Sequence, residues 1–179
     1  MATSAAGLVS TTVSTTQLAP LGFELLEPAS SGADSNAGEG QKVWVYVQND
    51  AAAAAAWSAG KIVQRLAGTS THLGELTAAA TVVPPARVLG VAQHAIPAGS
   101  FGFILKRGIG FITPGNGAPL TADAAVTSGG TITAGTGLIA LADANAITDT
   151  TNEVVGWCTV TALAGPLTNA TCWIDCSGG

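Results

Sequence analysis

The stretch that decides the fold is RVLGVAQHAIPAGSFGFILKRGIGFIT, from Arg87 to Thr113. RVLGVAQHA and SFGFILKR have the apolar alternation and the length of β-strands, and IPAG between them has the residues of a hairpin turn. Glycine lets strands bend or cross closely, and it occurs at Gly90, Gly99, Gly102, Gly108 and Gly110. The pattern predicts hairpins that supply a core and carry few groups able to do chemistry.

The clearest single strand is KVWVYVQ, residues 42–48. Its β-branched and aromatic side chains suit a pleated surface. Because side chains alternate along a strand, Trp44 and Tyr46 are expected on one face and Val45 and Val47 on the other.

The end of the chain predicts a hairpin with a definite register. A turn centred near Gly165 places Trp157 opposite Trp173 and Cys158 opposite Cys172. An aromatic pair across two strands stabilises a sheet by roughly 0.5–1 kcal/mol. A register shifted by one residue would separate both pairs.

The alanine-rich segment after Asp50 leaves two alternatives open. Asp50 could cap a helix from Ala51 to Ala59 that stops at Gly60, but so short a helix is marginal unless Trp57 docks. Otherwise the segment is irregular. The expected fold is therefore mostly β: a compact β-barrel or β-sandwich-like module of hairpins, with an extended N-terminal arm and little helix.

The chain divides into an arm and one domain. Residues 1–22 are rich in Ser, Thr and Ala, and we expect an extended arm that orders only against a neighbouring molecule, by strand addition or wrapping. A frayed terminus is the alternative. Residues 23–179 are expected to form a single β-rich domain.

Composition narrows the classes of function. Charged residues make up only 9% of the chain, against roughly 25% in an ordinary soluble domain, which favours a surface partly hidden in an assembly. An alanine-rich host genome is an alternative cause. The net charge is −5, and the six Lys and Arg are scattered along the sequence, which argues against nucleic-acid binding. The sequence has neither a transmembrane run nor a signal-peptide pattern, so maturation in a cytoplasm is expected.

Groups for catalysis or metal binding are sparse. His94 lies on an apolar hairpin, and Cys172 and Cys176 have no further zinc ligands nearby in sequence. We therefore predict no enzyme activity, no metal and no cofactor, although the sequence leaves a long-range pair of catalytic acids open. The four tryptophans could form a carbohydrate platform, but packing of two or three of them in the core is the favoured interpretation.

Four motifs follow one another along the chain: AGKIV (59–63), VLGVAQ (88–93), IPAGSFGFIL (96–105) and RGIGFI (107–112). Their order resembles that in the small cement or decoration proteins of tailed-bacteriophage capsids. GQKVWVYVQ (40–48) also looks like the first strand of some phage head proteins. The resemblance covers roughly residues 40–135, so the arm and the last hairpin depart from it.

The resemblance implies a structural virion protein, made in the cytoplasm of a host bacterium and located on the capsid surface. Such a protein binds the outside of an assembled capsid, often as a homotrimer, and stabilises contacts between subunits of the major capsid protein. Neither a membrane nor nucleic acid is an expected partner. The alternative is a ligand- or carbohydrate-binding β-module of a phage fibre or surface structure. Candidate residues for the capsid or subunit interface are Val9, Val13, Leu18, Trp57 and Phe111.

Overall fold

The fold is mostly β, as the sequence predicts, and the described residues contain no α-helix. The computed structural model describes residues 7–28, 40–51, 56–66, 72–76, 88–112, 114–115, 125–126, 131–132, 137–140, 154–158, 162–163 and 170–176. A helix spanning Ala51 to Ala59 is wrong in its second half, because Trp57 forms an antiparallel β-bridge with Ile96. Residues 52–55 lie outside the described part.

Five strands form a closed barrel. Each pairs with the next around the ring, and the last pairs with the first, which leaves no open edge within the ring. Within this ring, every pairing is antiparallel except the one between β3 and β5. In ring order the strands are β3 (Lys42–Asn49), β5 (Leu73–Leu76), β4 (Ile62–Arg65), β6 (Val88–Val91) and β7 (Phe101–Ile112).

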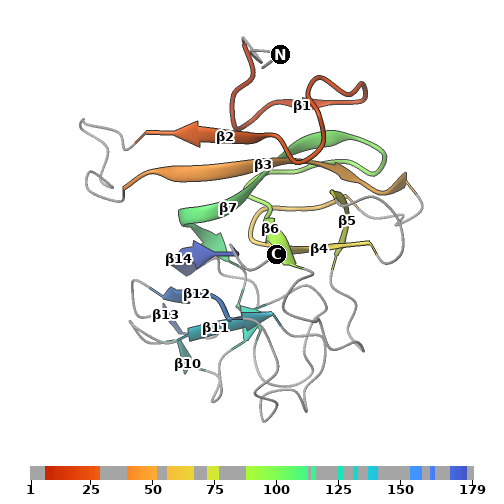
Figure 1. The fold of residues 1–179 in the computed structure, drawn as a ribbon. Coiled ribbons are helices and arrows are strands. Elements are labelled where there is room, and N and C mark those ends of the chain that lie inside the picture. The colour runs from red at the N-terminus through yellow and green to blue at the C-terminus, as the bar shows by residue number, and fades with distance from the viewer. Residues whose placement is uncertain are drawn as a thin grey trace.

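Further strands extend the barrel on both sides (Figure 1). β2 (Glu24–Glu27) pairs with β3, and β1 (Val13–Ser14) pairs with the start of β7. The end of β7 pairs with β14 (Ala170–Asp175), which continues the sheet. Beyond β14 the order is β12 (Val154–Cys158), β11 (Gly137–Ala140), β9 (Ala125–Val126) and β8 (Pro114–Gly115); β10 (Thr131–Ile132) and β13 (Ala162–Leu163) form a separate pair.

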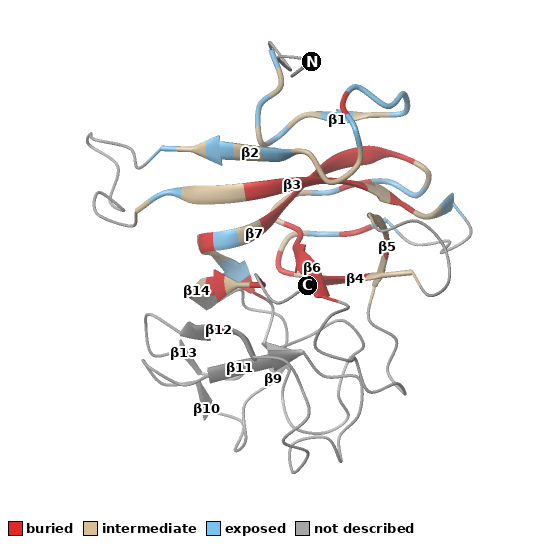
Figure 2. Ribbon diagram, viewed as in Figure 1, coloured by how far each residue is buried: buried red, intermediate tan, exposed pale blue. Residues whose placement is uncertain are grey.

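The predicted alternation of β3 is confirmed, and it divides the core into two clusters. Trp44 and Tyr46 pack in one cluster, whereas Val45 and Val47 pack in the other. The rings of Tyr46 and Phe103 lie 5.0 Å apart, so the first cluster is partly aromatic. Figure 2 shows the buried residues concentrated along β3, β6, β7 and β14. Burial of these apolar surfaces supplies the main stabilising free energy.

The predicted register of the last hairpin is also confirmed. Trp157 is the backbone partner of Trp173, and Cys158 is the partner of Cys172. β14 lies between β12 and β7, so the hairpin is attached to the barrel through the second half of β7. Cys172 and Ile174 are fully buried in the aromatic cluster, which anchors this attachment.

Gly108 marks the point where β7 changes partners. Its φ of 121° is one that other residues rarely adopt, and the last pairing of β7 with β3 is at Arg107. A Cβ at Gly108 would lie 3.0 Å from Cγ of Lys42. Glycine is required here because the backbone turns and β3 crosses closely.

The sequence predicted an N-terminal arm that orders only against a neighbouring molecule. In the structure, the described part of this segment packs against its own chain. Residues 7–22 lie on the sheet of their own chain: Val13 pairs with Gly102, and the amide of Leu18 donates to Oη of Tyr46 at 3.1 Å. Ala19 is buried in the aromatic cluster, and Leu8 and Leu21 pack against it. The expectation is corrected because these apolar side chains find a complementary surface on their own barrel.

Candidate interface surfaces

The N-terminal segment and β2 carry most of the large exposed apolar side chains in the described part of the chain. Val9 and Leu26 are each 57% exposed, and Leu18 is 50% exposed. Val13 is exposed as well. Figure 2 shows exposed residues along this segment and on β2. Three of the predicted interface residues, Val9, Val13 and Leu18, are therefore accessible to a partner.

Val9 and Leu26 share one pocket. It has a volume of about 340 Å³ and lies between the N-terminal segment and β2. We call its lining the N-terminal apolar surface, which consists of Leu8, Val9, Ser10, Leu25, Leu26, Glu27 and Pro28. Leu8 and Leu25 also pack against the aromatic cluster, so the floor of the pocket is fixed by the core. The sequence analysis did not predict Leu26 as an interface residue. Its exposure follows from the position of β2 as an edge strand of the sheet, which the sequence does not reveal.

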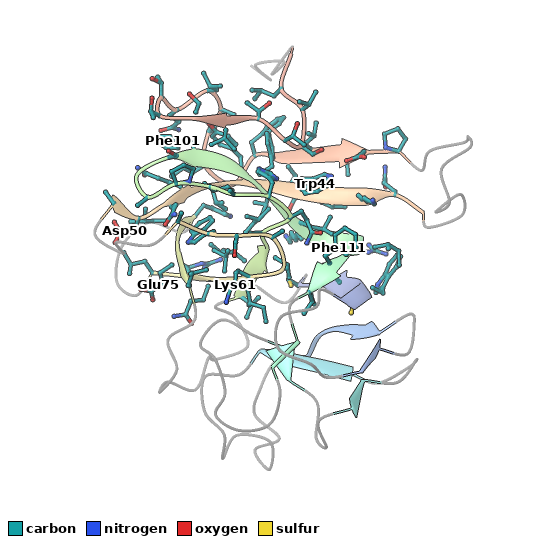
Figure 3. All side chains as sticks on the ribbon, turned by 180° about the vertical axis from the view of Figure 1, so that it is seen from behind. Trp44, Asp50, Lys61, Glu75, Phe101 and Phe111 are labelled. Carbon is teal, nitrogen blue, oxygen red and sulfur yellow. The ribbon has the colours of Figure 1, made fainter. Side chains whose placement is uncertain are left out.

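Phe111, near the C-terminal end of β7, provides a further exposed apolar side chain outside the N-terminal apolar surface. It is 49% exposed and pairs with Thr171 of β14. The side chain of Gln93 holds its backbone: Nε2 donates to the Phe111 carbonyl at 2.9 Å, and Oε1 accepts from the Phe111 amide at 2.7 Å. Figure 3 shows Phe111 and Phe101 near opposite ends of β7. The backbone that presents the Phe111 ring is therefore held from two sides.

Trp57, the remaining predicted interface residue, is not exposed. It is 0% exposed and packs in the second cluster with Val63 and Ile96. Its amide donates to the Ile96 carbonyl at 3.0 Å, and the Ile96 amide donates back at 3.1 Å. The prediction of an exposed anchor is wrong because the large indole ring buries more apolar area than any of its alanine neighbours can.

Trp44 is also buried, and its indole Nε1 donates to Oε2 of Glu27 at 2.7 Å. Two of the four tryptophans therefore belong to the core, in agreement with the favoured interpretation of the sequence. Trp173 is half-buried. A carbohydrate platform that uses Trp44 or Trp57 is thus not formed.

Charged residues that are distant in sequence line a second, smaller pocket beside β2. A pocket of about 140 Å³ is lined by Glu24, Val43, Lys106 and Arg107. Nζ of Lys106 lies 2.9 Å from Oε1 of Glu24. The pocket is therefore lined by two of the six Lys and Arg of the chain, and Lys42 precedes Val43 on the adjacent strand.

The two histidines lie in different surroundings. Burial lowers the pKa of His72, and the positive charges of Arg65 and Lys106 lower that pKa further, although Glu24 opposes them. Burial alone lowers the pKa of His94. Both imidazoles are therefore held toward the neutral form by their surroundings.

Among the residues that the structure describes, no three His, Cys, Asp or Glu side chains gather in the manner of a metal site. The same part of the chain contains no helix long and apolar enough to cross a membrane. Taken together, the fold and the exposed surfaces define a closed five-stranded β-barrel with an appended sheet and apolar contact surfaces. Comparison with protein-family models, curated proteins and solved structures found no match to this chain.

Proposed function

We propose that the protein is a structural virion protein that binds the outside of an assembled phage capsid and stabilises contacts between major capsid protein subunits. The observation that carries the proposal is the N-terminal apolar surface, where Val9 and Leu26 flank a pocket on an otherwise well-packed barrel. Contiguous exposed apolar residues of this kind favour protein contact. The sequence resemblance to capsid cement proteins and the low charge content support the same class.

Stabilising contacts between capsid subunits requires more than one contact surface on the binding protein. The N-terminal apolar surface receives an apolar side chain of one capsid subunit in its pocket. Phe111, held by Gln93 near the far end of β7, contacts a second subunit. Both surfaces are carried by strands of one continuous sheet, so their positions relative to each other are fixed by strand pairing. In this proposal the protein acts by binding and catalyses no reaction.

If the protein is a homotrimer, each copy needs only a weak contact with the capsid for the whole trimer to bind stably. Once one copy of a trimer is bound, the other copies face the capsid at a high effective concentration, so their binding is intramolecular. Light scattering coupled to size-exclusion chromatography tests this part of the proposal. The expected result is a mass three times that of the 17.5 kDa chain. A monomeric mass at micromolar concentration would contradict the trimer.

Co-sedimentation with expanded capsids of the phage that encodes the chain tests the function itself. The full chain is expected to pellet with capsids, and the double variant V9S/L26S is expected to lose at least about tenfold in affinity. Both residues are exposed, so the variant keeps its core. The control A98S changes an exposed turn residue and should bind like the wild type. Failure of the full chain to pellet would reject the proposal.

A further inference from the structure

The small basic pocket beside β2 has a charge that contrasts with the rest of the molecule. The chain carries a net charge of −5, yet Lys106 and Arg107 outnumber Glu24 in the pocket lining. The pocket lies beside the last pairing of β3 with β7, which joins Val43 to Arg107. Two cations against one carboxylate in the lining favour a negatively charged ligand, even with Asp175 opposite Arg107 on β14.

The charges in the pocket have different roles. Lys106 is partly buried, and its Nζ pairs with Oε1 of Glu24 at 2.9 Å, so this ion pair holds one side of the pocket. Arg107 is exposed, and the structure shows no ion pair between its side chain and another described residue. A guanidinium presents two parallel N–H donors that match a carboxylate, and Val43 offers an apolar wall to the carbon atoms beside such a group.

The size of the pocket limits its ligand. Pockets for cofactors and drug-sized molecules have volumes of about 300–1,000 Å³, whereas this one measures about 140 Å³. A single acidic side chain fits that volume. Nucleic acid is disfavoured, because a phosphate backbone requires a row of unpaired cations and Glu24 stands within the pocket.

From these observations we infer that the pocket of Glu24, Val43, Lys106 and Arg107 binds one acidic side chain of a partner protein. In this inference Arg107 forms a bidentate pair with the partner's carboxylate. The ion pair between Lys106 and Glu24 holds the opposite side of the pocket in place. The identification of that partner as a capsid subunit rests on the proposed function, but the carboxylate site does not. The pocket would add charge specificity to apolar contacts that have little specificity themselves.

The site is tested first on the isolated full chain, with a small probe. N-acetyl-glutamate α-amide carries only the side-chain carboxylate, and N-acetyl-glutamine α-amide is its neutral equivalent. In ¹H–¹⁵N NMR spectra, the Arg107 Nε–Hε signal and the Val43 amide are expected to shift and saturate with the first probe only. Equal responses to both probes, or saturation with inorganic phosphate but not with the carboxylate, would overturn the inference.

Two variants separate the guanidinium geometry from charge alone. R107K keeps the charge but loses the fork of donors, and it should weaken binding of the carboxylate probe about tenfold. K61Q removes a positive charge elsewhere and should bind the probe like the wild type. Undiminished binding by R107K would overturn the bidentate pairing. A thermal unfolding curve for each variant verifies that it is folded.

Co-sedimentation with capsids then tests the partner. R107Q is expected to lose at least about tenfold in capsid affinity and to depend less on salt between 50 and 300 mM, because a charge pair is gone. If the wild type fails to bind capsids while the NMR probe saturates, the proposed function fails and the carboxylate site stands. If capsids bind but R107Q binds equally well, the site is not part of that interface and the assignment of its partner is overturned.

Discussion

At the scale of single residues, Gly108 requires glycine for two reasons: its backbone conformation and the lack of space for a side chain. Its φ of 121° strains any residue with a side chain, and an added Cβ would press on Lys42 of the crossing strand. The sequence marked this position only as a bend or bulge. The structure adds the reason, which is that β7 exchanges β3 for β14 there.

Replacement of Gly108 is therefore expected to destabilise the fold. G108A should lower the free energy of unfolding by about 1–3 kcal/mol, the usual cost of a strained backbone position. Urea denaturation followed by tryptophan fluorescence measures the change. A98S, on an exposed turn, is the control and should leave the midpoint unaltered. Wild-type stability of G108A would mean that the backbone relaxes without cost.

The histidines predict a pH dependence of stability with a definite sign. In the unfolded chain an imidazole gains its proton as the pH falls through about 6.5, whereas the lowered pKa values of His72 and His94 delay protonation in the folded protein. The unfolded state thus binds more protons in that range. Stability is complete above about pH 6.5 and decreases as the pH falls below it.

Urea midpoints at pH 7.5 and pH 5.5 measure this dependence. The wild type should have the lower midpoint at pH 5.5, and the double variant H72Q/H94Q should show a smaller difference between the two conditions. Both pH values lie above the usual range of carboxylate titration, so the acids contribute little to the comparison. An unchanged slope in the double variant would assign the effect to other groups.

At the scale of elements, the N-terminal segment is the clearest difference between expectation and structure. Its Ser- and Thr-rich sequence predicted an arm without a partner in its own chain, yet Ala19, Leu8 and Leu21 complete the aromatic cluster. Spacing within the segment cannot reveal this, because the complementary surface is built from β3 and β7, which are distant in sequence. The segment therefore stabilises its own barrel while it presents Val9 to a partner.

Removal of residues 1–21 tests the structural role of this segment. The truncated chain should lose about 2–5 kcal/mol of unfolding free energy, since buried leucine contacts and part of a cluster are lost. Hydrogen exchange is expected to rise along β3 and the first half of β7. A98S is the control and should leave stability nearly unchanged. Wild-type stability of the truncated chain would show that residues 1–21 do not stabilise the barrel.

The last hairpin is the element that sequence reasoning predicted in most detail. Hairpin register follows from the position of the turn, so the pairs Trp157–Trp173 and Cys158–Cys172 could be derived without tertiary information. A double-mutant cycle with W157A and W173A should give a coupling free energy of about 0.5–1 kcal/mol. Strict additivity of the two substitutions would show that the facing positions do not interact.

At the scale of the whole molecule, the proposed function makes a prediction about the capsid. A protein that binds only the assembled shell raises the free energy needed to disrupt it. Capsids saturated with the full chain should therefore disrupt at a higher temperature in differential scanning calorimetry than bare capsids. V9S/L26S at the same concentration should give a smaller shift. Identical disruption temperatures with and without the wild-type protein would contradict a stabilising role.

The sequence by itself determined the strand-rich class, the two faces of β3 and the register of the last hairpin. These features depend on the alternation of apolar and polar side chains and on the position of the turn, both of which are set by residues close together in sequence. Only the tertiary structure decided that the strands close into a ring, that Trp57 is buried, and that Glu24 lines one pocket with Lys106 and Arg107. Each of these depends on pairing between strands far apart in the chain, where many partners satisfy the same local pattern and only joint packing selects one.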